Sequence, residues 1–135
     1  MMLVRRQMME YLELYPIGTD IIEKYVGRDS VGCALISAMH TISETTGEYE
    51  ETHLTHAATE VFMRVHPDYR YQKSADGRLY RIAYYDINYN YIGSSPSYNN
   101  LKVTDLQAPP PNAAYARYVT HSARSNWNLK IIRIA

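Results

Sequence analysis

The sequence predicts an α+β domain in which N-terminal helices, about residues 2–66, pack on a C-terminal antiparallel sheet, about residues 69–134. Two observations predict this division. Up to Val65 the apolar residues recur at helical spacing, whereas after Pro67 they alternate with polar residues as they do in strands. The length of 135 residues allows one compact core and no second core of full size, so we expect a single domain over 1–135.

Four helices are predicted in the first half from apolar spacing, capping residues and helix breakers. A hydroxyl side chain such as that of Thr19 caps a helix start, and Gly27 suits a helix end. Pro16 and Pro67 end the first and fourth helices, because the residue before a proline avoids the helical region. The predicted helices run from Met2 to about Tyr15, from Thr19 to Gly27, from Asp29 or Ser30 to near Thr45–Gly47, and from about Glu48 to Val65.

Five strands are predicted in the second half from two-residue alternation. The Asp76-Gly77 pair is a strong signal for a hairpin between the first two strands. The segment 93–96 ends the third strand, and 108–112, with three prolines, predicts a stiff polyproline II loop. The predicted strands are Tyr69–Lys73, Arg78–Asp86, Asn88–Ile92, Tyr115–Thr120 and Asn128–Ile134.

The composition excludes several classes of protein. Apolar residues make up 46% and charged residues 21%, values of an ordinary globular domain rather than of a disordered chain. No apolar run reaches the ~18 residues of a membrane span, and no secretory leader is recognisable, so we expect a cytoplasmic protein with no membrane partner. The single Cys33 excludes an intramolecular disulfide framework. No glycine-rich phosphate loop occurs, and we expect no cofactor.

Charge is divided unevenly along the chain. Residues 1–60 hold ten acids and four bases, a net charge of −6, whereas residues 61–135 hold four acids and ten bases, a net charge of +6. The chain therefore has an acidic, helical half (1–66) and a basic, tyrosine-rich β half (67–135). Such an asymmetry fits either charge neutralisation between packed halves or two binding faces of opposite sign.

Tyrosine accounts for 14 of the 16 aromatic residues, and eight tyrosines fall between positions 69 and 98. A tyrosine buries a large ring while its hydroxyl stays wet, which suits a recognition surface. Alternation places Tyr80 and Tyr84 on one face of their strand and Arg81 and Tyr85 on the other. We expect partner contacts from Tyr69, Arg70, Tyr71, Arg78, Tyr80, Arg81, Tyr84, Tyr89 and Tyr91.

Two kinds of partner fit this predicted face. Aromatic and basic residues interleaved on strands occur in proteins that bind single-stranded nucleic acid, where bases stack on the rings. A pI near 7 and the lack of a ribonucleoprotein motif favour a protein partner instead. A second candidate face, aimed at a basic partner, holds Glu44, Glu48 and Glu51.

Two alternative functions, a metal site and a hydrolase active site, are considered for the acids, the histidines and the cysteine. In the predicted fourth helix, spacings of three and four residues bring four potential metal ligands to a similar face: Glu50, His53, His56 and Glu60. We consider a solvated helix face the simpler explanation of these four.

Cys33 near the start of a predicted helix, a later His121 and then Asn126 follow an order similar to that of papain-like hydrolases. Position 27 is glycine where such enzymes usually carry a glutamine, and a packed, inert thiol is the simpler explanation of Cys33.

We therefore expect a small, non-enzymatic, intracellular protein that engages a macromolecular partner through the Tyr/Arg-rich sheet face. A compact chain of opposed charge without a cofactor motif suits an inhibitor or adaptor of a mobile element such as a phage. The alternatives are a single-stranded nucleic-acid-binding protein and a small Cys-His hydrolase. The sequence also leaves a homo-oligomer open.

Overall fold

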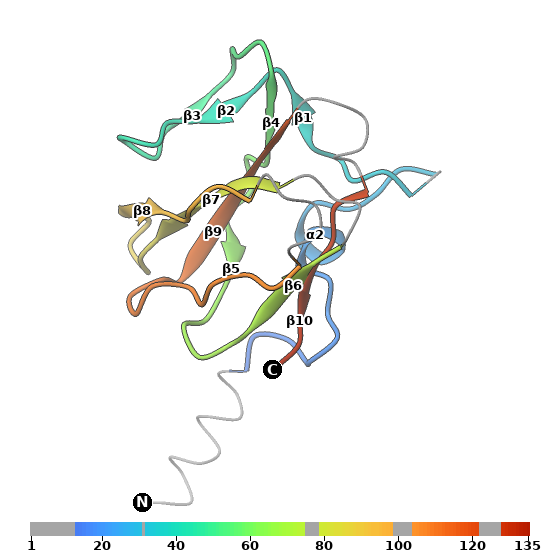
Figure 1. The fold of residues 1–135 in the computed structure, drawn as a ribbon, viewed down its shortest axis with the longest axis vertical. Helices are drawn as coiled ribbons and strands as arrows, with labels where there is room; N and C mark the ends of the chain where they lie inside the picture. The colour runs from blue at the N-terminus through green and yellow to red at the C-terminus, as the bar shows by residue number, and fades with distance from the viewer. Residues whose placement is uncertain (1–12, 31, 75–78, 99–103, 122–127) are drawn as a thin grey trace, which may run out of the picture.

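The computed structural model describes residues 13–30, 32–74, 79–98, 104–121 and 128–135 (Figure 1). Within these ranges the chain is mostly antiparallel β-sheet with one short helix. The predicted α+β class, with N-terminal helices packed on a C-terminal sheet, is therefore wrong. The strands come from both halves of the chain, and residues 37–64 alone supply five of them.

A six-stranded antiparallel sheet forms the centre of the fold. Its order is β1-β4-β9-β7-β8, and β5 pairs with the part of β9 that β4 leaves free. The two long strands, β7 and β9, lie side by side in the middle (Figure 1). The bounds are β1 Ser37–Ala38, β4 His56–Ala58, β5 Met63–Arg64, β7 Leu79–Tyr85, β8 Tyr91–Ser94 and β9 Tyr115–His121.

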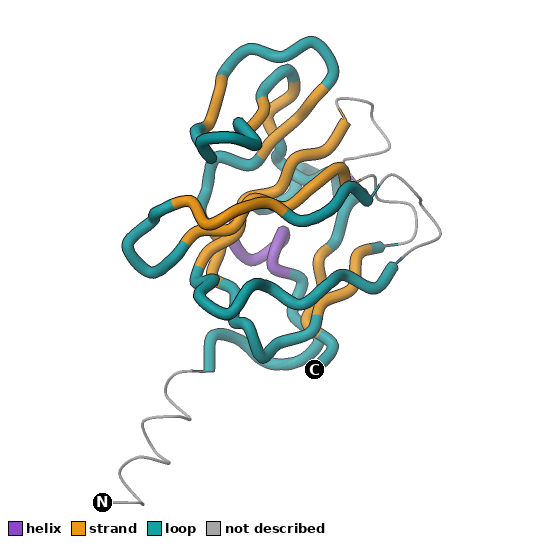
Figure 2. Tube along the Cα trace, turned by 60° about the vertical axis from the view of Figure 1, so that its left-hand side comes forward, coloured by secondary structure: helices purple, strands orange, loops and turns teal. Residues whose placement is uncertain are grey.

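Two small antiparallel ribbons flank this central sheet. One is the β2–β3 hairpin, made of Thr41–Ile42 and Tyr49–Glu50, and the other pairs β6, Tyr71–Lys73, with β10, Ile131–Arg133. In Figure 2 the described helix lies in the middle of the molecule, between the central sheet and the β6–β10 ribbon. In the described part of the chain, no helix has the length and hydropathy needed to cross a membrane.

Helix α2, Ile21–Tyr25, is the predicted second helix, and its local signals explain it. Asp20 rather than Thr19 is the cap: its carboxylate accepts from the Ile22 N–H at 3.0 Å. The same carboxylate forms an ion pair with Arg28 at 2.6 Å and accepts from the Ile131 N–H at 3.2 Å, which ties α2 to β10. The first predicted helix, from Met2 to Tyr15, lies almost wholly outside the described residues.

The third and fourth predicted helices are wrong, because their residues form β1 to β5. Leu54 and Val61, which a helix would bury, are 85% and 46% exposed. Consecutive Ala57 and Ala58 are instead both fully buried, Ala57 in the larger hydrophobic cluster and Ala58 in the smaller one. A strand covered on both faces carries consecutive buried apolar residues. In a short segment this pattern cannot be distinguished from the apolar spacing of a buried helix.

The predicted hairpin between residues 69 and 86 is also wrong. Strand β6 pairs with β10, whereas β7 pairs with β8 and β9. The third predicted strand is displaced, since β8 begins at Tyr91 and continues through Gly93. The last two predictions, β9 and β10, are confirmed.

An irregularity in β7 changes which residues share a face. The register with β9 shifts between Leu79 and Arg81, so that an extra residue is accommodated there. Leu79 consequently lies in the larger cluster with Ile82 and Tyr84, while Tyr80 packs against the smaller cluster. The predicted common face for Tyr80 and Tyr84 is therefore wrong.

Arg117 on β9 holds the β2–β3 hairpin on the central sheet. Its guanidinium is buried and donates to the Gly47 carbonyl at 3.0 Å, to the Tyr85 hydroxyl at 3.2 Å and to the Glu60 carbonyl at 3.3 Å. Its carbon Cζ lies 4.1 Å from the centre of the Phe62 ring. Carbonyls and rings satisfy this cation in place of a carboxylate.

Two further contacts support the same hairpin. Buried Arg81 donates to the Ile42 carbonyl, while its Nη1 has no hydrogen-bond partner among the described residues. The Tyr91 hydroxyl donates to the Glu44 carbonyl at 2.6 Å and shares a hydrogen bond with Ser94 at 2.7 Å. Because unpaired buried donors cost free energy, Arg117 is the better satisfied of the two arginines.

Replacement of Gly47 by alanine tests this attachment. Gly47 has φ +72, and a Cβ there would lie 2.3 Å from Cγ of Tyr91. We expect Gly47→Ala to lower the free energy of unfolding by about 2–4 kcal/mol, through the clash and the left-handed backbone, as measured by urea denaturation.

Gly18→Ala is the matched control, because Gly18 also has a positive φ, +95, but no atom lies within 4 Å of its added Cβ. It should lose only about 1 kcal/mol. Equal losses in the two variants would show that the Tyr91 contact does not hold the hairpin.

Candidate functional site

Three of the six tyrosines expected to contact a partner are buried. Tyr69, Tyr71 and Tyr84 are only 8%, 4% and 4% exposed, and Arg81 is 7% exposed. Arg78 lies outside the described residues. The predicted contact residues therefore do not form one continuous surface.

Hydrogen bonds explain how these rings are buried at low cost. The hydroxyls of Tyr15 and Tyr71 share a hydrogen bond of 2.7 Å, and the Tyr15 hydroxyl also lies 2.7 Å from the Arg64 carbonyl. Burial raises the pKa of Tyr71 to about 12, so its phenol stays protonated and can donate. The Tyr69 hydroxyl accepts from the Leu14 N–H at 3.0 Å. A tyrosine-rich stretch can thus supply a core as well as a surface.

Tyr89 is 54% exposed, more than any other tyrosine that was expected to contact a partner. It lies in the turn between β7 and β8 with φ +66, a left-handed conformation that bulky residues rarely adopt. Tyr80 and Tyr91 are half-buried, and Arg70 is exposed. The Tyr91 hydroxyl is already bound to the β2–β3 hairpin, as described above.

The Tyr89 ring belongs to an exposed aromatic patch. It stacks on Tyr115, with ring centres 4.5 Å apart and planes at 17°, and meets the Phe62 ring at 5.0 Å. Val61, next to Phe62 in the chain, and Ile87, two residues before Tyr89, are 46% and 56% exposed. We call these five residues the aromatic patch. Exposed apolar surface of this kind often marks an interaction site.

The turn that presents Tyr89 is held by Asp86. Its carboxylate accepts from the N–H groups of Asn88 and Asn90 at 2.9 and 3.0 Å, and these bonds lower the pKa of Asp86. The Asp86 and Asn90 backbones also pair, and the Tyr89 N–H donates to the Asp86 carbonyl at 3.0 Å. The local network therefore maintains the left-handed backbone at Tyr89.

Sequence reasoning identified Tyr89 but missed the rest of the aromatic patch. Phe62 and Val61 were assigned to a helix, and Tyr115 to a strand without a role. The segment Asp86–Asn90 does carry a turn composition, rich in Asn and Asp, that could have marked an exposed loop. The stacking of Tyr115 on Tyr89 depends on β7–β9 pairing and has no local signal.

The expected acidic face is brought together, although on a hairpin rather than on helices. Glu44 and Glu48 lie in the turn of the β2–β3 hairpin, Glu50 lies on β3 and Glu51 follows it. All four side chains belong to exposed residues. Glu60 is also exposed, and it acts with Glu51 on the pKa of Tyr49, which burial raises.

The histidines expected as metal ligands form a ring cluster instead. The rings of His53 and His56 stack with centres 3.8 Å apart, and His56 meets the Tyr80 ring edge-on at 4.9 Å. Tyr80 in turn stacks on His121 at 5.5 Å. Glu50 and Glu60 lie on other segments, and no group of three or more His, Cys, Asp or Glu residues within the described ranges could hold a metal.

The environment of Cys33 differs from the one that the hydrolase alternative requires. Cys33 lies in a loop after α2, where its N–H donates to the Asp29 carboxylate at 2.9 Å, and no helix begins there. The described residues therefore do not place Cys33 at the helix N-terminus that the hydrolase alternative requires. Asn126 lies outside the described residues. His121 ends β9 in the ring cluster with Tyr80 and His56.

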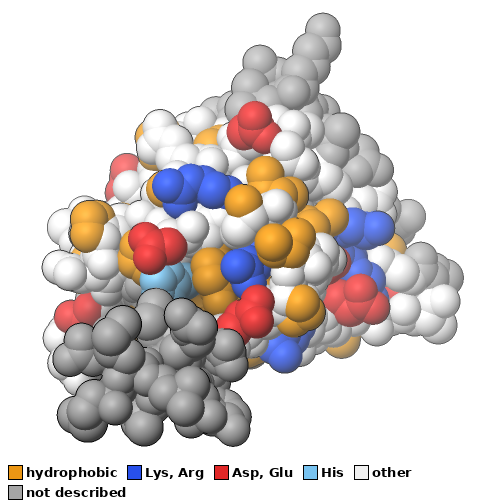
Figure 3. Space-filling model, turned by 90° about the horizontal axis from the view of Figure 1, so that it is seen from below, with side chains coloured by type: hydrophobic (Ala, Val, Ile, Leu, Met, Phe, Trp, Pro, Cys, Tyr) orange, Lys and Arg blue, Asp and Glu red, His pale blue; other side chains and the backbone are white. Residues whose placement is uncertain are grey.

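Several of the basic side chains in the second half of the chain are buried. Lys73, Arg81 and Arg117 are 2%, 7% and 7% exposed, and Arg133 forms an ion pair with Glu13 at 2.8 Å. The lower face of the molecule mixes hydrophobic, basic and acidic side chains (Figure 3). This distribution differs from the cationic groove of single-strand binders.

Comparison with known proteins assigns no family to this site. No family model matches the chain, and no curated protein or solved structure is significantly similar to it.

The ring cluster predicts a pH dependence of stability. Burial, together with the neighbouring His53 and Arg81, lowers the pKa of His56 from 6.5 to about 4. Between pH 6.5 and 4 the unfolded chain therefore binds this proton and the folded chain does not, so stability falls as the pH falls through this window. We expect His56→Gln to reduce that loss, as measured by Tm at steps between pH 7.5 and 4.5.

His66→Gln serves as the control, because His66 lies away from the ring cluster, beside Asp68 and Tyr69. This variant should follow the parent chain. If His56→Gln loses as much Tm on acidification as the parent does, the half-buried imidazole of His56 is not the cause.

Proposed function

We propose that the protein binds a protein partner through the aromatic patch of Val61, Phe62, Ile87, Tyr89 and Tyr115. The observation that carries the proposal is Tyr89, a large ring held 54% exposed on a left-handed backbone. Strained residues that the surrounding structure maintains are concentrated at functional sites. Exposed tyrosines are also frequent energetic centres of protein interfaces.

The surroundings of the aromatic patch support a protein partner over a nucleic acid. Glu60 precedes Val61, Asp86 precedes Ile87, and the Arg64 guanidinium lies 5.2 Å from the Tyr115 ring centre. An apolar centre with charges of both signs at its edge is the usual anatomy of a protein interface. A single-strand binder needs a continuous cationic track, and three of the bases in the second half are buried.

The proposal retains Tyr89 from the expected contact set and moves the site from a broad sheet face to a turn. The buried tyrosines act indirectly, because they make up the core on which this turn rests. No catalytic group is required at the aromatic patch. Stacking on Tyr115 holds the ring in place, and a binding role accounts for its exposure at a backbone position that favours glycine or asparagine.

Tyr89→Gly tests the proposal without endangering the fold, because glycine adopts φ +66 freely. Removing a central interface ring costs about 2 kcal/mol or more of binding, roughly a thirtyfold loss of affinity. We expect the parent chain, used as bait in a lysate of the cells that express it, to retain a protein that Tyr89→Gly loses. The complex should survive nuclease treatment and raised salt.

Ile17→Ser is the matched control, since Ile17 is 62% exposed and lies outside the aromatic patch. It should retain the same protein in the same amount. A complex that disappears on nuclease treatment would favour the nucleic-acid alternative. Retention of every captured protein by Tyr89→Gly, or its equal loss with Ile17→Ser, would contradict the proposal.

A further inference from the structure

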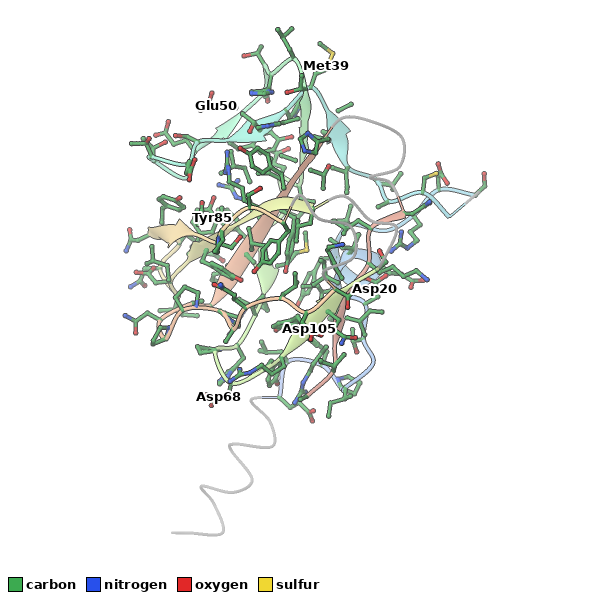
Figure 4. All side chains as sticks on the ribbon, viewed as in Figure 1. Asp20, Met39, Glu50, Asp68, Tyr85 and Asp105 are labelled. Atoms are coloured by element: carbon green, nitrogen blue, oxygen red, sulfur yellow. The ribbon has the colours of Figure 1, made fainter. Side chains whose placement is uncertain are left out.

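A second surface feature lies at the other end of the central sheet, outside the aromatic patch. A groove of about 510 Å³ runs between residues 38–40, at the end of β1, and residues 51–54, before β4. Figure 4 places Met39 and Glu50 at this upper end of the molecule, far from Asp68. The volume falls within the range of ligand sites and is large enough for several side chains of a peptide.

The apolar part of the groove is exposed, and a backbone hydrogen bond joins its two walls. Leu54 is 85% exposed and Met39 is 54% exposed. Met39 has φ +64, a second strained bulky residue, and its carbonyl accepts from the His53 N–H at 2.7 Å. This bond joins the two walls of the groove, so the exposed side chains stand on a connected backbone.

The charged part of the groove is acidic. Glu51 is one of its lining residues, and Glu50 precedes it on β3. Glu44 and Glu48 add negative charge in the turn at the other end of the same hairpin, and none of the described lining residues is a lysine or an arginine. Apolar side chains beside carboxylates complement a ligand that carries both apolar groups and positive charge.

We infer that this groove is a docking site for a basic peptide segment of a partner protein. An aliphatic or aromatic side chain of the segment would pack on Met39 and Leu54. A lysine or arginine beside it would pair with Glu51, and arginine could also stack on the imidazoles of His40 or His53. The groove and the aromatic patch share no residue, so the inference stands independently of the proposed function.

Selection from a displayed library of random dodecapeptides tests the inference on the full chain. The peptides that the parent chain retains should carry net positive charge and at least one aliphatic or aromatic residue. Chemical-shift changes on adding a selected synthetic peptide should concentrate at residues 38–40 and 51–54. They should leave residues 86–90 unchanged.

Two pairs of variants then identify the contacts by fluorescence anisotropy with the labelled peptide. Glu51→Gln and Leu54→Ser should each weaken binding about tenfold, since both side chains are exposed and their loss leaves the core intact. Glu23→Gln and Ile17→Ser make the same chemical changes at exposed positions elsewhere and should leave affinity within about twofold.

Three results would overturn the inference. The first is a selection that yields no binder or only acidic and neutral peptides. The second is chemical-shift changes at the aromatic patch in place of the groove. The third is equal affinity for the parent chain, Glu51→Gln and Leu54→Ser.

Discussion

The buried guanidinium of Arg117 is the interaction on which both surfaces depend. A planar group with five donors and two flat faces can satisfy carbonyls around its edge while aromatic rings cover it. In this protein the edge binds Gly47, Glu60 and Tyr85, and Phe62 covers one face. These bonds attach residues from the first half of the chain to β9 in the second half. A carboxylate partner would neutralise the charge of Arg117, but it would occupy donors that here bind three separate segments.

The aromatic patch and the groove are both connected to this guanidinium, through Phe62 and through Gly47. Phe62, packed under Arg117, meets the Tyr89 and Tyr115 rings that reach the surface. The β2–β3 hairpin, bound through Gly47, carries Glu50 and leads directly into the wall of the groove. The charge pattern follows the same arrangement, because Lys73, Arg81 and Arg117 are buried while the glutamates of the β2–β3 hairpin are exposed. The net charge of zero therefore conceals an acidic hairpin over a cationic interior.

Local signals predicted the elements that local chemistry controls. Helix α2 has its cap at Asp20 and its glycine stop at Gly27, and strands β9 and β10 have clear alternation. Prediction failed where burial on two faces imitates a helix, as at Ala57 and Ala58 in β4. It also failed at Asp76-Gly77, whose flanking strands pair with β10, β8 and β9 instead of with each other. Of the residues in the two proposed surfaces, Tyr89 and Glu51 belong to the contact sets expected from the sequence, whereas Phe62 and Tyr115 do not.

Composition and order alone determined an abundance of tyrosine and an uneven division of charge, and they predict a single domain. Only the tertiary structure decided which tyrosines face water, because that depends on which strands pair and in what register. The irregularity between Leu79 and Arg81 moves Leu79 to the face of Tyr84 and Tyr80 to the other face. Strand β9 takes its partners from residues 56–64 and 79–85, which are distant in the chain. Periodicity indicates which side chains of a segment are buried, but it does not identify the strand with which the segment pairs. The pairing decides which side chains reach the surface.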